Sequence, residues 1–530
     1  MNSRHLLAIT SLALLASFGL APVRAANAAE QLGKVSFPTS CDPKVQPQFE
    51  RGVAMLHSFW YSAAEKTFRD VVEQDPSCAI ARWGFASILM LNPLAGTGAS
   101  PKGAALAQTA IEQGRQIGAK TQRERDYIEA VAAYYEDWAN RPESARQIAR
   151  AKAYEALAAR YPDDDEGQIF YALYLAGTQT QADQTYAAYL KAALILEKQF
   201  TKYPDHPGVA HYLIHSYDAS PIAQQGLPAA RRYSSIAPSA PHALHMPSHI
   251  FTRVGAWADS AATNQRSALT ARTGNEPDES LHASDYMVYA YLQLARDGEA
   301  RKVIEDTQTV GGLNPARNTG PYALAAMSAR YALERGDWSG AMTLQPQANK
   351  FLFTEALTRF ARALGAARTG EPAAAEKEVQ QLASLRDALK AAKNDYWATE
   401  VEVNRLGAAA WTALAQGRND EALTLMRSAA DIEDKSEKHI VTPGRIIPAR
   451  ELLGEMLLEL KRPAEALKEF EASAQREPNR FRGLAGAAQA AAQAGDPGKA
   501  RQYYARLVEL AGNGDPRPEL ARAKAYLAQR

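Results

Sequence analysis

The sequence of 530 residues predicts an all-α protein made of helix pairs that stack along the chain. Alanine, leucine, arginine, glutamate and glutamine dominate from Phe49 onward, and these residues favour helices. No long alternation of valine, isoleucine and threonine, which strands require, interrupts them. Prolines recur where second helices should end, and because proline cannot continue a helix, they give each pair a firm stop. These prolines stand in Asp75-Pro76, Tyr161-Pro162, Tyr203-Pro204 and Glu477-Pro478.

Composition and charge narrow the class of protein. Hydrophobic residues make up 46% of the chain and charged residues 22%, which is typical of a globular protein with a sizeable core. The formal net charge is +1, and removing Arg4 and Arg24 with an N-terminal leader lowers it by two, to −1. A nucleic-acid-binding protein needs a basic surface, so we expect no nucleic-acid partner.

The N-terminus has the pattern of a secretory signal peptide over residues 1–28. Arg4 and His5 give a short positive start, Leu6 to Leu20 is an apolar run, and Val23-Arg24-Ala25 and Ala26-Asn27-Ala28 offer small residues for cleavage. The run is short for a membrane span, and no later stretch reaches the ~20 apolar residues that a span needs. We therefore expect a soluble, exported protein, periplasmic or secreted.

Cys41 and Cys78 are the only cysteines. In an oxidising compartment two cysteines usually pair, so the sequence favours a disulfide between them. The helix-pair pattern places both cysteines before the first helices of neighbouring units, where a bridge is geometrically reasonable. The alternative is two buried thiols.

Small and large residues recur in a fixed order between the prolines. The first unit has Gly52, Ala64, Phe68, Val71 and Pro76; a later one has Gly454, Ala466, Phe470, Ser473 and Pro478; the next has Ala488, Ala500, Tyr504 and Leu507. Looser matches lie around Ala422, Met426 and Ala429 and around Trp338 and Ala341. The pattern resembles the tetratricopeptide repeat, a helix-turn-helix unit of ~34 residues, most closely over 49–85 and 448–512. The resemblance implies an α-solenoid, a right-handed superhelix with a concave inner surface.

The same resemblance suggests a division of the mature chain. Residues 29–430 would form the N-terminal and central solenoid, 431–447 an ordered linker and 448–530 the C-terminal repeats. Leu91 to Gly103 is a loop rich in glycine and proline. It lacks the lysine and serine or threonine that end a phosphate-binding loop, so we interpret it as a connector or a lid.

Two longer stretches resemble an exported bacterial family of such repeat proteins. They are His242-Ala-Leu-His-Met-Pro-Ser-His-Ile-Phe with Gly255 and Trp257, and Lys438-His439 through Thr442-Pro-Gly to Gly454. That family has no established activity, so the resemblance implies architecture and not function.

Histidines gather in one short window. Of the ten in the chain, six lie between residues 206 and 249: His206, His211, His215, His242, His245 and His249. A helix that begins at Pro207 would place His211 and His215 one turn apart on one face, with Asp218 continuing that side. Histidine is the commonest metal ligand and a frequent proton shuttle, so this window is the first candidate site.

The last three of these histidines would share one face of a second helix, which begins near Pro241 and is kinked at Pro247. The two helices together predict a metal site, and imidazole ligands suit zinc, copper or iron. The candidate ligands are His211, His215, His242, His245, His249 and Asp218. Asp218, or Asp285 with His282, is a candidate carboxylate ligand or an orienting group outside the ligand shell.

A structural role for these histidines is the alternative. If Pro247 instead opens a helix, His245 falls outside it and the shared face is broken. The histidines would then be packed core residues or a polar patch lining the groove. We interpret His57 as structural and His439 as an ordered-loop residue; an approach of His439 to the cluster through closure of the superhelix is the less favoured alternative. The sequence contains no His-Glu-x-x-His and no Gly-x-Ser-x-Gly motif.

Two functions remain open. The first is a periplasmic binding or scaffolding protein that holds a peptide, a protein segment or a small ligand in its concave groove. The second is a metal-binding protein or a metal-dependent hydrolase or oxidase that uses the histidine cluster.

Overall fold

The computed structural model describes residues 30–529, and within this range every regular element is helical. The predicted signal peptide, residues 1–28, lies outside the described residues. Among the helices of the described range, none combines the length and the apolar character needed to cross a bilayer. The prediction of an all-α protein is confirmed.

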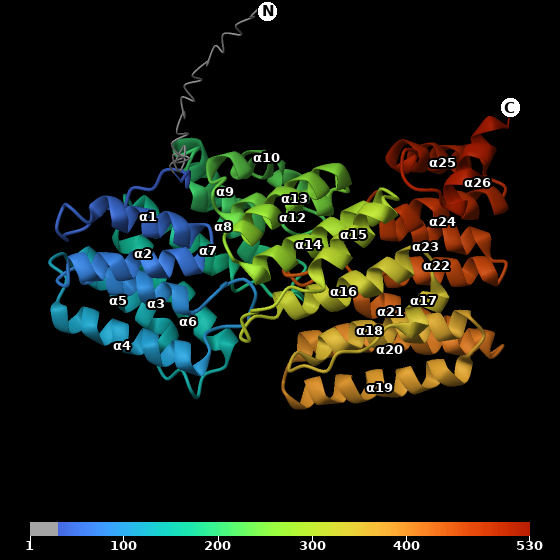
Figure 1. The fold of residues 1–530 in the computed structure, drawn as a ribbon, viewed down its shortest axis with the longest axis horizontal. Helices are drawn as coiled ribbons and strands as arrows, with labels where there is room; N and C mark the ends of the chain where they lie inside the picture. Colours follow the sequence, from blue (N-terminus) through green and yellow to red (C-terminus); the bar gives the residue numbers. More distant parts are fainter. Residues whose placement is uncertain (1–29, 530) are drawn as a thin grey trace, which may run out of the picture.

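The N-terminal part contains nine helices, coloured blue to green in Figure 1. They are α1 (Gln46–His57), α2 (Tyr61–Gln74), α3 (Ile80–Leu89), α4 (Pro101–Ile117), α5 (Gln122–Tyr135), α6 (Glu143–Arg160), α7 (Asp165–Ala176), α8 (Ala187–Lys202) and α9 (Pro207–Ser216). Successive helices pack on one another as pairs, and α1 also contacts α9, which closes this part on itself.

The middle of the chain holds shorter helices around two long ones. Its elements are the 3-10 turn η1 (Ala223–Gly226), α10 (Leu227–Ile236), α11 (Pro241–His245), α12 (Pro247–Arg253), α13 (Trp257–Thr273), α14 (Pro277–Gln293), α15 (Asp297–Thr307), α16 (Thr319–Glu334) and α17 (Trp338–Thr343). Helix α14 contacts α11, α13, α16 and α24, so it joins the helices of the middle part to the C-terminal part.

The C-terminal part continues the stack of helix pairs, coloured orange and red in Figure 1. It consists of α18 (Leu352–Arg368), α19 (Pro372–Ala391), α20 (Asp395–Ala415), α21 (Asn419–Glu433), α22 (Ala449–Glu459), α23 (Pro463–Arg476), α24 (Phe481–Gln493), α25 (Pro497–Ala511) and α26 (Pro518–Ala528). Turns without a helix fill residues 434–448, where the sequence predicts an ordered linker. The division of the chain into domains stays a prediction.

The repeat pattern corresponds to real packing. The ring of Phe68 on α2 lies between two glycines, and a Cβ atom would come within 3.0 Å of the ring at Gly52 and within 2.5 Å at Gly84. Phe470 on α23 lies in the same way against Gly454 and Gly486. An aromatic side chain that fills the space left by small residues on the two adjacent helices is what the tetratricopeptide pattern predicts, so the resemblance is confirmed at these units.

Cys41 and Cys78 form the predicted disulfide, with Cα atoms 4.8 Å apart. It ties the segment before α1 to the segment before α3. Buried apolar side chains form a first large cluster from Leu32 to Phe251, a second from Trp257 to Met327 and a third from Tyr322 to Ala500. The histidine-rich helices lie where the first and second clusters meet.

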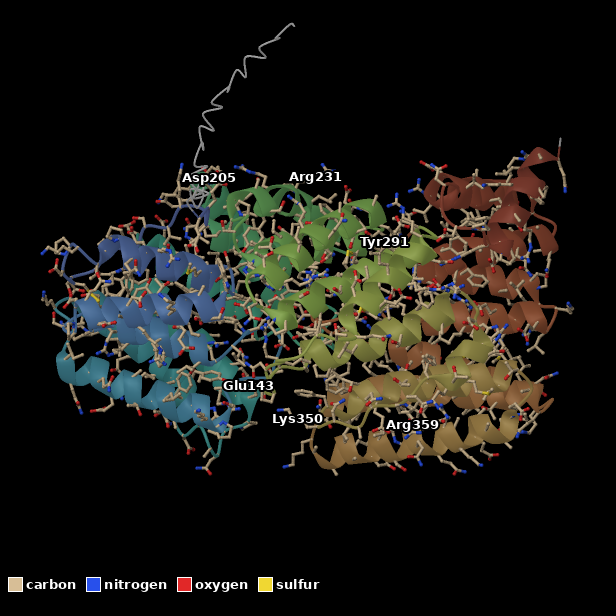
Figure 2. The ribbon with its side chains drawn as sticks, in the orientation of Figure 1. Glu143, Asp205, Arg231, Tyr291, Lys350 and Arg359 are labelled. Atoms are coloured by element: carbon tan, nitrogen blue, oxygen red, sulfur yellow. A yellow bond between two sulfur atoms is a disulfide. The ribbon has the colours of Figure 1, made fainter. Side chains whose placement is uncertain are left out.

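The surface carries a hollow of about 690 Å³ between elements that are far apart in sequence. Glu143 at the start of α6 and Lys350 before α18 both line it, and Figure 2 shows them on facing sides. Phe353, Trp397 and the loop around Thr97 contribute to its walls. The loop between α3 and α4 therefore forms part of the wall of this hollow.

Candidate metal centre

Six histidines from four helices converge in the interior, and none is more than 6% exposed. They form two groups of three, and within each group one ring nitrogen per residue lies within 4.8 Å of the others. The first trio is His211, His215 and His242, from α9 and α11; the second trio is His245, His249 and His282, from α11, α12 and α14. Rings of the two trios are 5.7 Å apart at His215 and His249 and 5.8 Å apart at His242 and His245.

The break between α11 and α12 decides how the second trio forms. Pro247 is the first residue of α12, but Met246 before it keeps helical angles, with φ −53° and ψ −36°. The backbone N–H of His249 still donates to the carbonyl of Met246 at 3.1 Å. The two helices therefore run on as one kinked helix, and His245 keeps a common face with His249 although Pro247 opens a new helix.

Both pairs of histidines four residues apart have the same geometry. The Nε2 atoms of His211 and His215 are 3.0 Å apart, and so are those of His245 and His249. Two nitrogens at this separation subtend about 90–95° at an ion with metal–nitrogen bonds of about 2.05 Å, an angle between those of square-planar and tetrahedral coordination. Each pair is thus spaced to share one metal ion.

Oxygen acceptors outside the cluster hold the Nδ1 atoms of four of the six histidines. Nδ1 of His211 lies 2.6 Å from the carbonyl oxygen of His57, Nδ1 of His245 lies 2.7 Å from Oδ1 of Asn264, Nδ1 of His249 lies 2.8 Å from Oδ2 of Asp218, and Nδ1 of His242 lies 3.1 Å from Oε2 of Glu279. Such acceptors hold the imidazole proton on Nδ1 and leave the Nε2 lone pair free, as is usual around metal-bound histidines.

His245 and His249 consequently face each other with two lone pairs. Asn264 Nδ2 donates to the carbonyl of Ser260 at 2.7 Å, which orients its Oδ1 toward His245 and fixes the proton on that ring's Nδ1. Burial lowers the pKa of His245 well below its usual value and that of His249 to about 4, although Asp218 opposes the shift at His249. Burial therefore disfavours an extra proton on either ring, and two neutral imidazoles with facing Nε2 atoms are suited to bind one metal cation.

Two ring nitrogens of the first trio also lack a hydrogen-bond partner. Nδ1 of His215 and Nε2 of His242 are buried and have no hydrogen-bond partner within the part of the chain that the structure describes. Buried polar atoms are normally paired, so orphaned nitrogens beside two other imidazoles indicate a missing ligand. Burial also lowers the pKa of His211 and of His215, which keeps these imidazoles neutral and able to bind a metal.

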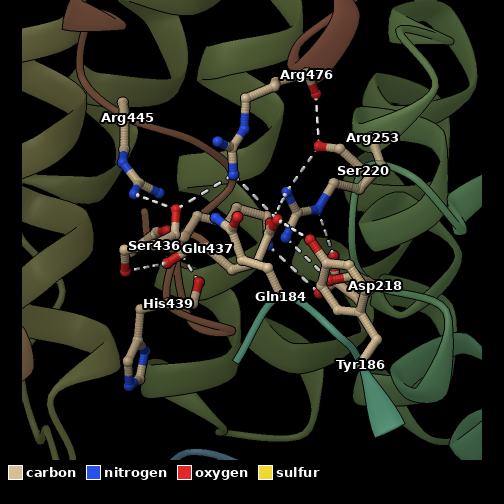
Figure 3. A network of polar contacts seen from close by, with 12 residues as sticks. Gln184, Tyr186, Asp218, Ser220, Arg253, Ser436, Glu437, His439, Arg445 and Arg476 are labelled. Atoms are coloured by element: carbon tan, nitrogen blue, oxygen red, sulfur yellow. Dashed lines mark hydrogen bonds and ion pairs between the residues drawn. The ribbon is translucent and has the colours of Figure 1, made fainter. Parts of the chain in front are cut away.

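Asp218 orients a ligand and is not a member of either trio. Its Oδ2 accepts from His249, its Oδ1 lies 2.8 Å from Nε of Arg253, and Nζ of Lys438 lies 3.3 Å from Oδ2. Burial alone would raise the pKa of this carboxyl, but Lys438, Arg253 and His249 hold it well below its usual range. Figure 3 shows Asp218 beside Arg253. Of its two predicted roles, the structure favours the orienting one.

His282 completes the second trio, with its ring 4.3 Å from that of His245. The sequence pointed to His282 only as a neighbour of Asp285, which was a candidate carboxylate ligand or orienting group. Asp285 instead accepts from Arg330 at 2.8 Å. No partner four residues away marks His282 in the sequence, since it reaches the cluster from a third helix.

His206 separates from the other histidines of its window. Its Nε2 and that of His57 both lie 2.9 Å from the carboxylate of Glu166. Burial would raise the pKa of Glu166, but the two histidines lower it to about 2. Nδ1 of His57 also lies 2.9 Å from the hydroxyl oxygen of Tyr212, and Nδ1 of His206 accepts from the backbone N–H of Val209. All four ring nitrogens are therefore satisfied, which agrees with a structural role.

A small cavity of about 40 Å³, the histidine cavity, lies beside both trios. Four of the histidines line it, together with two loops: His215, His242, His249, His282, the segment from Leu91 to Thr97, and Ile440 with Val441. The loop predicted as a connector or lid thus covers the centre in part. His439 lies in the second loop, but its ring packs on Tyr396 and Trp397, with centroids 5.4 and 5.0 Å away.

Fold and site together define an all-α repeat protein with a buried six-histidine centre. No protein-family model matches the chain, and no curated protein matches it. Among solved structures it is similar to the Cut9–Hcn1 hetero-tetramer of the APC/C, with 12% identity, a TM-score of 0.30, and 91% of this chain and 95% of that one covered.

It is also similar to the human IFIT1 dimer with m7Gppp-AAAA, at 12% identity and a TM-score of 0.38, over 77% of this chain and 87% of that one. The same human dimer with PPP-AAAA gives 12% identity and a TM-score of 0.36, over 87% and 89% of the two chains. Similarity at TM-scores this low does not indicate a function, and the function proposed below rests on the site.

Proposed function

We propose that this protein is a metalloprotein that holds two transition-metal ions in its six-histidine centre, one in each trio. The observation that carries the proposal is the geometry of His245 and His249: their buried Nε2 atoms lie 3.0 Å apart, while Asn264 and Asp218 hold their Nδ1 atoms. Neutral imidazoles favour copper, zinc or iron over magnesium and calcium, which prefer oxygen ligands.

The number of ligands supports a reactive centre. Structural zinc sites usually have four protein ligands, whereas catalytic sites have three and leave a position open. Each trio offers three nitrogens, and the histidine cavity lies against both. A metal-dependent enzyme is therefore the form of the proposal that the geometry supports best.

Metal analysis tests the proposal. Protein made without a histidine tag is stripped with a chelator, loaded separately with copper, zinc and iron, and freed of excess metal by gel filtration. We expect two ions per chain for at least one metal. The double variant His245→Ala and His249→Ala should retain one ion, because it removes two ligands of the second trio only.

The His439→Gln variant is the matched control, since it changes a buried histidine whose ring packs outside the two trios. It should keep both ions. A wild-type chain that retains less than one ion of every metal would overturn the proposal, and so would a double variant that binds as much metal as the wild type.

The other predicted function, binding of a peptide or protein segment in a concave groove, stays a prediction. The export of the chain to a periplasm also stays one, supported by the pattern of residues 1–28.

A further inference from the structure

The histidine cavity is shared by the two trios. Four of its lining residues are clustered histidines, two from each trio: His215, His242, His249 and His282. A molecule in this cavity would therefore lie beside ligands of both candidate metal sites. The larger hollows do not offer this position, since the hollow of about 690 Å³ touches none of the six histidines and another of about 560 Å³ touches His242 alone.

The size of the cavity limits what it can hold. Its volume is about 40 Å³, whereas small-molecule sites usually measure about 300–1,000 Å³ and a cavity of about 150 Å³ is large enough for benzene. One molecule of liquid water takes up about 30 Å³. The cavity therefore has room for a molecule of about two or three non-hydrogen atoms, and not for a peptide, a sugar or an aromatic ring.

Two loops cover the cavity and are packed against each other. Ala95 lies in the loop between α3 and α4, and Ile440 and Val441 lie in the turns after α21. These three residues form an apolar cluster of their own, with Leu94 packed against it, and each is at most 8% exposed. The apolar contacts hold the two loops together over the cavity, so it stays small.

The charged side chains of the wall are paired. Apart from the histidines, Glu279 and Arg317 are the titratable residues that line the cavity. Arg317 donates to one carboxylate oxygen of Glu279 at 2.5 Å, and the other lies 3.1 Å from Nδ1 of His242. The rest of the wall is apolar or uncharged: Leu91, Asn92, Ala95, Thr97, Asn318, Thr319, Ile440 and Val441. Within the described part of the chain, the wall therefore offers no free charge to an ionic substrate.

Dioxygen is a neutral reactant of this size. Protein-bound copper and iron react with it, whereas zinc has no redox chemistry. We propose that the histidine cavity binds one molecule of dioxygen between the two trios, when these hold reduced copper or iron. The proposal rests on the proposed metal function and narrows it, because it names the reactant and leaves zinc out.

Three ligands of different size test the proposal: carbon monoxide, methyl isocyanide and tert-butyl isocyanide. All three bind reduced copper or iron through a terminal carbon, and the last has three more carbon atoms than the second. Full-length protein loaded with copper or iron is reduced without oxygen and titrated with each ligand, and the infrared stretch of the bound ligand gives the affinity. Carbon monoxide and methyl isocyanide should bind. The tert-butyl compound should bind at least about tenfold more weakly than methyl isocyanide, because its branched end overfills the cavity.

Ile440→Ala should enlarge the cavity at its cover. It should strengthen binding of tert-butyl isocyanide at least about tenfold and leave carbon monoxide binding unchanged. Ile446→Ala is the matched control. It changes the same residue type in the same segment of turns, 4% exposed against 6% for Ile440, but Ile446 packs in the C-terminal cluster and does not line the cavity. This variant should keep the wild-type order of affinities.

Competition connects these ligands to dioxygen itself. Reoxidation of the reduced metal by dioxygen should slow as the concentration of carbon monoxide rises, because both molecules need the same cavity. A rate that does not depend on carbon monoxide would overturn the assignment of dioxygen to this cavity.

The outcomes separate the two proposals. A chain that retains no metal would refute both. Protein that retains zinc but neither copper nor iron would overturn the dioxygen site and leave the metal proposal intact. The same holds for copper or iron protein that binds no carbon monoxide, that binds tert-butyl isocyanide as tightly as methyl isocyanide, or whose Ile440→Ala variant distinguishes the two as the wild type does.

Discussion

At the scale of single residues, four of the six clustered histidines have Nδ1 against an oxygen acceptor outside the centre. At His245 the acceptor is the side-chain oxygen of Asn264, at 2.7 Å and fully buried. Without this acceptor the imidazole could move its proton to Nε2 and would lose its fixed orientation. Mutation of such an outer hydrogen-bond partner typically lowers metal affinity by about 10–100-fold.

Asn264→Ala should therefore weaken the second site about 10–100-fold and leave the first site unchanged. Competition with a chromophoric chelator measures both affinities in one titration. Asn264→Asp keeps an oxygen acceptor for His245 and should retain most of the affinity. Equal losses in the two variants would mean that the side chain of Asn264 acts through packing and not through its oxygen.

The sequence predicted five of the six clustered histidines because four of them occur as pairs with the helical spacing of one turn. His211 with His215 and His245 with His249 meet within one helix or one kinked helix, so spacing alone brings them together. His282 reaches the second trio only because α14 packs on α11. A lone histidine on another helix gives no such spacing signal. The sequence also could not decide between the two roles of Asp218, because its orienting role depends on its contacts with Arg253 and Lys438.

At the scale of helices, glycines determine how closely neighbours approach. Gly486 on α24 lies directly against the ring of Phe470, whereas Gly407 on α20 has room, since a Cβ there would meet Phe360 at 3.5 Å. The same substitution should therefore have opposite effects at the two positions.

Gly486→Ala should destabilise the C-terminal helices by about 1–3 kcal/mol, because the added methyl overpacks the contact with Phe470. Gly407→Ala should be neutral or stabilise by up to about 1 kcal/mol, since alanine restricts the unfolded chain. Thermal unfolding midpoints measure both. An unchanged midpoint for Gly486→Ala would show that the ring and the two helices separate freely.

The kink between α11 and α12 shows where sequence alone leaves a choice. Residues before proline are biased away from helical angles, so a break at Met246 with loss of the common face was one of the two predictions. The structure has the kinked form: Met246 keeps helical angles, and α12 packs against α10 and α13. The outcome depends on tertiary contacts, which local spacing does not contain.

For the whole molecule, the centre depends on segments that are far apart in the chain. The segment after α21 reaches back to the N-terminal part: Lys438 pairs with Asp218 at 3.3 Å, and Glu437 pairs with Arg253 at 2.9 Å and accepts from Tyr186 at 2.8 Å. Figure 3 shows this network around Glu437. It holds Ile440 and Val441 over the histidine cavity.

The helix-pair pattern predicted the class of fold, since composition, proline positions and the small-large order each recur along the chain. It did not predict how the stack closes around its middle, because buried ion pairs such as Lys438 with Asp218 connect residues more than two hundred positions apart. His439 illustrates that a loop can be placed from the sequence while the direction of its side chain cannot. Its loop does cover the cluster, but its ring turns toward Tyr396 and Trp397.

Anomalous X-ray diffraction from crystals of the metal-loaded protein tests the central claim most directly. We expect two peaks, one inside each trio, with three histidine nitrogens about 2.0–2.1 Å from each peak. Asp218 and Asn264 should still hold the outer nitrogens of His249 and His245. Crystals of protein incubated with metal that show no peak in the interior, or peaks bound only by surface residues, would contradict the account.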